Sequence, residues 1–295
     1  MLARVQRSIF NSFKIMSSYL IVALTLLSSS AFAADNISDK FQGYDGCFIL
    51  YDLKKNKRVA VNNSKRCETR LSPCSSFKIA LSLMGFESGI FKDENNPVWQ
   101  ITTQQKQEME ENFAKFDDKI KKPLIEAWMK NQSPQSWMKN SVVWYSQDLT
   151  NKLGMEKFKN HLNNFDYGNM DVSGNPGKND GLTQSWLMSS LKISADEQIQ
   201  FLRKLLTYQL PVSKSAIDYT KNISFLEDLP SGWKLYGKTG GGSNLGWFVG
   251  WIEKSGQTYI FAANITPKKE QAPNPLGMMA KKITREIFLG LDFLN

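Results

Sequence analysis

A serine and a lysine stand three positions apart at Ser75 and Lys78, just after Ser72 and Pro73 and just before an apolar run. On a helix, residues three apart lie on one face, so the serine hydroxyl and the lysine amine can meet. A neutral lysine can take the proton of a serine and turn it into a nucleophile, and apolar neighbours favour the neutral amine. Ser72 and Pro73 predict that a helix begins near Ser75, where free backbone N–H groups could stabilise an oxyanion.

This spacing alone is a weak signal, because Ser136, Ser189 and Ser231 each precede a lysine by three positions as well. The order of the motifs that follow makes Ser75 different. Three tripeptides come downstream of it, namely Ser141-Val142-Val143, Tyr167-Gly168-Asn169 and Lys238-Thr239-Gly240. A Ser-x-x-Lys motif, a second serine motif and Lys-Thr-Gly occur in this order in serine enzymes that recognise penicillin.

On these motifs the chain resembles the class D (oxacillinase-type) serine β-lactamases across essentially the whole of residues 34–295. Val143 stands where class A enzymes have the asparagine of Ser-Asp-Asn, and the tripeptide that begins at Tyr167 is typical of class D. The resemblance implies hydrolysis of β-lactam antibiotics through a covalent acyl-serine, and resistance to those antibiotics. It also implies a fold shared with the penicillin-binding proteins.

The resemblance implies three catalytic residues. Ser75 attacks the lactam carbonyl, Lys78 is the general base in both half-reactions, and Ser141 relays a proton to the departing lactam nitrogen. Lys78 is expected to be N6-carboxylysine, formed with carbon dioxide or bicarbonate, because a free lysine with a reference pKa near 10.4 is charged at neutral pH. No other cofactor and no metal is expected. Ser141 could instead be an ordinary helix cap.

Seven further residues are expected to contact the substrate or the lysine. Lys238 supplies charge and Thr239 a hydroxyl to the substrate carboxylate, while Gly240 and Gly241 let a β-lactam approach the strand edge. The backbone N–H groups of Gly241 and Ser75 are expected to form the oxyanion hole. The remaining three are Val143, which keeps the lysine dry, Trp186, which donates to the modified lysine, and Trp128 at the rim. Val143 and Trp186 are also compatible with a plain core role. A plain hairpin could explain the glycines, although the motif favours the substrate approach.

One position departs from the family pattern. Many class D enzymes have an arginine on the C-terminal helix that holds the substrate carboxylate, and Ala280 stands at the matching position here. Lys281 could replace it, although lysine lacks the bidentate fork of arginine. Otherwise Thr239 and Lys238 are expected to hold the carboxylate.

The N-terminal 33 residues read as a secretory signal peptide. Arg4, Arg7 and Lys14 precede the apolar run 19–27, and the segment 31–33 (Ala-Phe-Ala) has the small-x-small form of a cleavage site. An apolar run near nine residues is too short for a membrane anchor, which takes about 20. We therefore expect a periplasmic protein that starts near residue 34 and has no stable membrane association.

Composition argues against several classes of function. The chain has a formal charge of +9, and loss of residues 1–33 removes three basic and no acidic residues, which leaves +6. Lysines and acids interleave along the chain, which is typical of solvated helix faces and not of a nucleic-acid-binding stripe. The single histidine, His161, argues against a Ser-His-Asp triad and a zinc site. The three cysteines, Cys47, Cys67 and Cys74, are expected to be unpaired, although Cys67 and Cys74 could pair.

Strand patterns lie at both ends of the mature chain and helix patterns lie between them. Strands are predicted over 46–53, 58–61, 233–238, 247–252 and 258–263, and helices over about 195–206 and 278–289. This arrangement predicts an α+β fold with one antiparallel sheet flanked by helices and an adjoining helical part, roughly within 80–195, of one catalytic domain over 34–295. The active site is expected in the cleft between the two parts, under an ordered loop over 167–185.

Two other functions remain open on the motifs alone. A penicillin-sensing receptor domain carries the same serine and lysine motifs but stays acylated, and a cell-wall transpeptidase or carboxypeptidase shares the fold. The signal peptide argues against the membrane-fused sensor, and Val143 argues against the transpeptidase.

Overall fold

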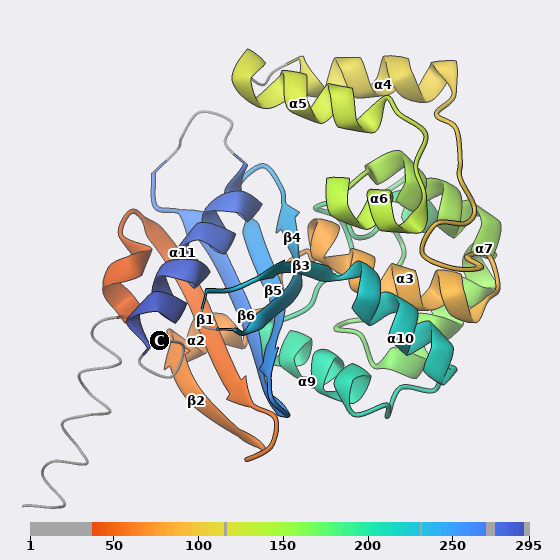
Figure 1. Ribbon diagram of the computed structural model, residues 1–295. Coiled ribbons are helices and arrows are strands. Elements are labelled where there is room, and N and C mark those ends of the chain that lie inside the picture. Colours follow the sequence, from red (N-terminus) through yellow and green to blue (C-terminus); the bar gives the residue numbers. More distant parts are fainter. Residues whose placement is uncertain (1–36, 115–116, 231, 270–274, 292–295) are drawn as a thin grey trace, which may run out of the picture.

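The computed structural model describes residues 37–114, 117–230, 232–269 and 275–291. The expected signal peptide lies outside the described residues. Figure 1 shows a twisted sheet with one long helix on its outer face and a group of helices on the other. The predicted α+β class is confirmed.

The sheet joins the two ends of the chain. Its strands are β1 (Tyr44–Asp52), β2 (Lys57–Asn62), β3 (Phe225–Asp228), β4 (Lys234–Gly241), β5 (Gly246–Lys254) and β6 (Gln257–Pro267). They lie in the order β2-β1-β6-β5-β4-β3, and every neighbouring pair is antiparallel. β1 near the N-terminus thus pairs with β6 near the C-terminus, as the strand patterns predict, and the helical segment between them must return to the sheet.

The strands β1, β5 and β6 are buried over most of their length because both faces of the sheet are covered. Cys47 and Ile49 of β1 pack into the larger core cluster, whereas Phe48 and Leu50 point to the opposite face. This alternation is the period of two expected for a strand. α11 (Leu276–Gly290) covers the second face, with its buried stripe against β4, β5 and β6.

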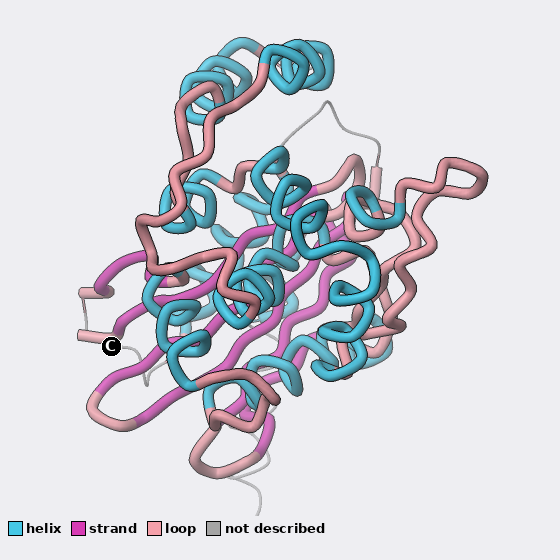
Figure 2. The backbone as a smooth tube through the Cα atoms, turned by 90° about the vertical axis from the view of Figure 1, so that its right-hand side faces the viewer, coloured by secondary structure: helices cyan, strands magenta, loops and turns pink. Residues whose placement is uncertain are grey.

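The other helices form the second part of the molecule, which packs on the first face of the sheet, while one helical hairpin stands away from it (Figures 1 and 2). They are α2 (Ser64–Cys67), α3 (Lys78–Glu87), α4 (Thr103–Phe113), α5 (Asp118–Trp128), α6 (Pro134–Asn140), α7 (Val143–Phe165), α8 (Gly181–Gln184), α9 (Ala195–Leu206) and α10 (Lys214–Ile223). Short 3-10 turns lie at η1 (Asp39–Phe41) and η2 (Cys74–Phe77). The predicted capping box of α9 is present, since Ser194 and Glu197 each accept the other's backbone N–H.

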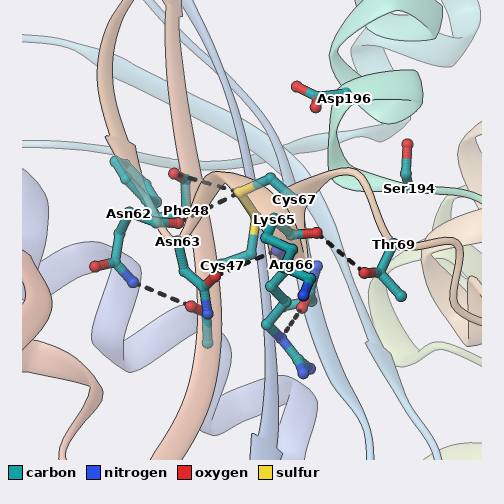
Figure 3. The surroundings of a disulfide bond; sticks show 12 residues. Cys47, Phe48, Asn62, Asn63, Lys65, Arg66, Cys67, Thr69, Ser194 and Asp196 are labelled. Carbon is teal, nitrogen blue, oxygen red and sulfur yellow. Dashed lines mark hydrogen bonds between the residues drawn. A yellow bond between two sulfur atoms is a disulfide. The ribbon is translucent and has the colours of Figure 1, made fainter.

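The expectation that all three cysteines are unpaired is wrong. Cys47 and Cys67 form a disulfide with a Cα–Cα distance of 5.3 Å, and Cys74 is free and buried. Figure 3 shows the reason: α2 packs beside β1, which brings Cys67 against Cys47 although 20 residues separate them. Cys74 lies next to Met188 instead, with 3.6 Å between the two sulfur atoms, so the Cys67–Cys74 alternative is also wrong.

Candidate active site

The Ser-x-x-Lys motif spans a 3-10 turn and the first residue of a helix. Ser75 lies in η2 and Lys78 opens α3, so the helix begins close to the predicted place. The turn is tight, since Cys74 has a φ of 49° and the Ser76 hydroxyl donates to the carbonyl of Pro73 at 2.7 Å. Lys78 Nζ lies 3.3 Å from Ser75 Oγ. Ser75 is partly exposed in an otherwise buried segment, so its hydroxyl is both accessible and close to an amine.

Lys78 is fully buried. Burial lowers the pKa of its amine well below the ordinary value, and the charge of Lys238 lowers it further. Within the described residues no carboxylate contributes to this shift, and the amine lies 5.9 Å from the ring of Trp137. The setting therefore favours a neutral amine, which is the form that can act as a base or react with an electrophile.

A second serine–lysine pair lies across the site. Lys238 Nζ donates to Ser141 Oγ at 2.9 Å and to the carbonyl of Thr239 at 3.0 Å. Lys238 is only 4% exposed, and burial together with the charge of Lys281 lowers its pKa to about 7. At neutral pH this lysine is thus poised between a cation, which binds a carboxylate, and an amine, which accepts a proton.

Gly240 brings β4 against η2, the turn that carries the candidate nucleophile Ser75 and is hereafter called the nucleophile turn. A Cβ at this position would lie 2.6 Å from the Pro73 carbonyl oxygen and 2.9 Å from the Ser76 nitrogen. Gly277 at the start of α11 packs on the other side, since its Cβ would lie 2.6 Å from the Gly240 oxygen. The close approach of η2 therefore requires glycine at 240, and the close approach of α11 to β4 requires glycine at 277. Gly241, the residue after Gly240, is exposed.

Trp186 joins the loop after α8 to the nucleophile turn. Its carbonyl accepts the Ser72 hydroxyl at 2.8 Å and the Cys74 N–H at 3.0 Å, and its ring lies 5.6 Å from that of Phe77. The indole N–H is buried and has no hydrogen-bond partner among the described residues. A buried indole N–H normally has an acceptor, so this donor is left unpaired within the described part of the chain.

The Tyr-Gly-Asn tripeptide fixes the segment that follows Trp186. Asn169 accepts the Lys192 N–H at 2.8 Å and donates to the Ser190 carbonyl at 2.9 Å. Gly168 has a φ of 61°, and a Cβ there would lie 2.1 Å from the Lys192 oxygen. The same segment pairs at Ile193 with Leu71, just before the nucleophile turn. The tripeptide thus supports the site from outside.

Sequence reasoning missed Gln198, which is 1% exposed on α9. Its amide donates to the Tyr167 hydroxyl at 3.2 Å and to the Ser76 hydroxyl at 3.3 Å, so it links the Tyr-Gly-Asn tripeptide to the nucleophile turn. A signal was present, because Gln198 is a polar residue on the apolar stripe with Leu202 and Leu205.

The remaining expected residues lie around these groups. Val143, which opens α7, is partly exposed, while its neighbour Val142 is fully buried. The Trp128 indole N–H donates to the Asn140 carbonyl at 2.9 Å, one residue before Ser141.

The two residues considered for carboxylate binding on α11 point elsewhere. Ala280 is buried, and Lys281 Nζ lies 3.3 Å from a carboxylate oxygen of Glu227.

The single histidine, His161, is hydrogen-bonded to Ser88, with 3.3 Å between Nε2 and Oγ. No group of three or more His, Cys, Asp or Glu that could hold a metal ion occurs among the described residues. In that same part of the chain, no helix has the length and apolarity needed to cross a membrane.

Comparison with known proteins identifies relatives. The family model of the penicillin binding protein transpeptidase domain matches residues 46–289. Beta-lactamase OXA-1 of Escherichia coli is 42% identical over 267 residues, covering 87% of this chain and 90% of that protein. Beta-lactamase OXA-9 of Klebsiella pneumoniae is 40% identical over 228 residues, covering 73% and 77%.

A solved structure agrees with these relatives. FUS-1 (OXA-85), a class D beta-lactamase from Fusobacterium nucleatum subsp. polymorphum, superposes with a TM-score of 0.73 at 30% identity, covering 88% of this chain and 99% of that one.

Two glycines with left-handed backbones provide a matched test of the Tyr-Gly-Asn support. Gly177→Ala places a Cβ in open space, so it should lower the free energy of unfolding by about 1 kcal/mol through backbone strain alone. Gly168→Ala adds the overlap with the Lys192 oxygen and should cost about 1–3 kcal/mol more. Urea unfolding of both variants measures the difference, and equal losses would contradict the role assigned to Gly168.

Proposed function

The chain belongs to the class D β-lactamases, and from this membership we propose how its residues hydrolyse a β-lactam. The enzyme opens β-lactam antibiotics and confers resistance to them. The observation that carries the proposed mechanism is the complete burial of Lys78 beside Ser75. A lysine in ordinary solution is charged at neutral pH and cannot take a proton, whereas burial lowers the pKa of this one and favours its neutral form.

We propose that Lys78 is carboxylated by carbon dioxide. A neutral amine forms a bond from its nitrogen to the carbon of carbon dioxide and releases one N–H proton to water, which gives a carbamate anion. The lowered pKa of Lys78 supplies that neutral amine. The buried indole N–H of Trp186, which has no partner among the described residues, fits such a group because it could donate to a carbamate oxygen. When present, the carbamate would supply an oxygen base in an apolar pocket.

The chain's own residues bind and orient the reactants. Ser75 supplies the attacking oxygen and lies within hydrogen-bond reach of the Lys78 side chain. Ser141 is the proton relay to the lactam nitrogen, and Lys238 at 2.9 Å from its hydroxyl replaces the proton that it gives away. The backbone N–H groups of Ser75 and Gly241 stabilise the oxyanion.

The substrate carboxylate is bound by Lys238 and Thr239 in this proposal. Lys281 is paired with Glu227, and Ala280 offers no polar atom, so neither replaces the arginine of related enzymes. Charged Lys238 lies next to the Thr239 hydroxyl, at 3.4 Å from Nζ to Oγ1, and the two form a donor pair for an anion.

The N-terminal signal pattern supports export to the periplasm. The Cys47–Cys67 disulfide supports it independently, since disulfides persist in oxidising compartments. We therefore propose that residues 1–33 are removed and that the mature enzyme acts outside the cytoplasm.

Replacement of Lys78 separates hydrolysis from a sensor-like reaction. Lys78→Ala should lower penicillin turnover by about 10²–10⁴-fold, because a general base is lost. After a short pulse of penicillin, mass spectrometry should show Lys78→Ala either unmodified or carrying a lasting acyl adduct. The further substitution Ser75→Ala should abolish that adduct, and the wild-type enzyme should be free of adduct within seconds. Wild-type turnover in Lys78→Ala, or a lasting adduct on the unmutated enzyme, would contradict the mechanism.

The two lysines predict opposite limbs of the pH profile of kcat/KM. Lys78 must be neutral, so activity should rise with pH on the acid side, and added bicarbonate should raise it there. Lys238 has a pKa of about 7 and must be charged to bind the carboxylate, so activity should fall above that pH.

The alkaline limb can be moved by a charge change at a distance. Lys281 lowers the pKa of Lys238, so Lys281→Met should move this limb to higher pH, while Lys282→Met, on the exposed next residue, should leave it in place. An alkaline limb that is identical in both variants would refute the assignment to Lys238.

A further inference from the structure

The peptide plane between Asn140 and Ser141 is held at both of its polar atoms. The N–H of Ser141 donates to the carbonyl of Trp137, and the carbonyl of Asn140 accepts the Trp128 indole N–H at 2.9 Å. The last carbonyls of a helix have no hydrogen-bond donor within that helix, so the indole N–H supplies the donor that the Asn140 carbonyl at the end of α6 would otherwise lack. The serine that follows this plane is the one paired with Lys238.

Ser141 needs this restraint because its backbone is in an unfavourable region. It has φ 60° and ψ 32°, the left-handed conformation in which a Cβ crowds the following carbonyl. Rotation of the Asn140–Ser141 plane would relax φ and move the hydroxyl away from Lys238. A hydrogen bond to the Asn140 carbonyl opposes that rotation.

Trp128 is itself held by a helical hairpin that stands away from the body of the molecule. Figures 1 and 2 show α4 and α5 above α6, with the rest of the fold below. Trp128 is the last residue of α5, its ring packs edge-on against Phe113 of α4 at 5.0 Å, and its carbonyl accepts the Trp144 indole N–H at 3.1 Å.

A second bond fixes the start of the hairpin. The Gln105 amide at the beginning of α4 donates to Asp148 of α7 at 3.0 Å. The hairpin is thus tied at its start to α7 and at its end to the residue before Ser141, and the orientation of Trp128 depends on both.

We propose that Trp128 is a positioning residue for Ser141, and that the α4–α5 hairpin serves the acylation step by holding this indole in place. The proposal rests on the proton-relay role proposed above for Ser141. It differs from a substrate contact at the rim, because the indole N–H is already bonded to the Asn140 carbonyl.

Trp128→Phe removes the N–H and keeps an aromatic ring. Because Ser141 acts when the lactam nitrogen departs, the acylation rate constant should fall about threefold to tenfold, the range of one hydrogen bond. The deacylation rate constant and the melting temperature should change little. Trp99→Phe is the matched control, since Trp99 lies at the base of the same hairpin and has no bond to Asn140, and it should leave acylation unchanged.

Stopped-flow and quenched mass spectrometry on the full mature enzyme measure the two steps separately. A double-mutant cycle then decides between positioning and substrate contact. If Trp128 acts through Ser141, Trp128→Phe should have no further effect on acylation in a Ser141→Ala background. Additive losses would contradict the proposal, as would an equal fall in acylation and deacylation.

The same cycle separates the two proposals. Unchanged acylation in Ser141→Ala alone would overturn the relay role itself. Slow acylation in Ser141→Ala together with normal acylation in Trp128→Phe would overturn only the positioning role.

Discussion

The active site depends on keeping one amine out of water. Burying an unpaired ammonium is so unfavourable that the group gives up its proton instead. Lys78 is fully buried, and no carboxylate among the described residues compensates its charge. The Trp137 ring lies 5.9 Å from the amine, and Phe77 and Trp186 belong to the hydrophobic core next to the same turn. Apolar packing of this kind would be a plain core in another protein, and here it surrounds the proposed base.

The site also requires that the sheet bring together residues from distant parts of the chain. Lys238 arrives on β4 from the C-terminal half, Ser75 on η2 from the N-terminal half, and Ser141 from the helices between them. These residues can meet only if β4 packs closely against the nucleophile turn, and the lack of a side chain at Gly240 allows that close packing. The charge of Lys238 then reaches Lys78 and lowers the pKa of its amine further.

Much of this could be read from the sequence, because the relevant signals are local. The apolar run at 46–53, the capping box at Ser194 and the spacing of Ser75 and Lys78 act over a few residues, and all appear in the structure as expected. The motif order predicts the family, which the comparisons confirm, and the resemblance to that family proposes roles for Ser141 and Lys238.

The sequence does not reveal contacts between elements that are distant along the chain. The Cys47–Cys67 disulfide depends on how α2 packs on β1, and the bonds of Gln198 depend on the placement of α9 beside the nucleophile turn. The sequence shows that Ala280 stands where related enzymes have an arginine. It does not show that Lys281 is paired with Glu227, because this ion pair depends on how α11 packs on the sheet.

The state of Lys78 is the centre of this account, and carbon-13 NMR of active enzyme supplied with labelled bicarbonate observes it directly. Carboxylation of Lys78 should give a carbamate carbon signal that is absent in Lys78→Ala and disappears reversibly at acid pH. The signal should also lose intensity in Trp186→Phe, which lacks the unpartnered indole donor. An enzyme that turns over penicillin at full rate in labelled bicarbonate without any carbamate signal would contradict it.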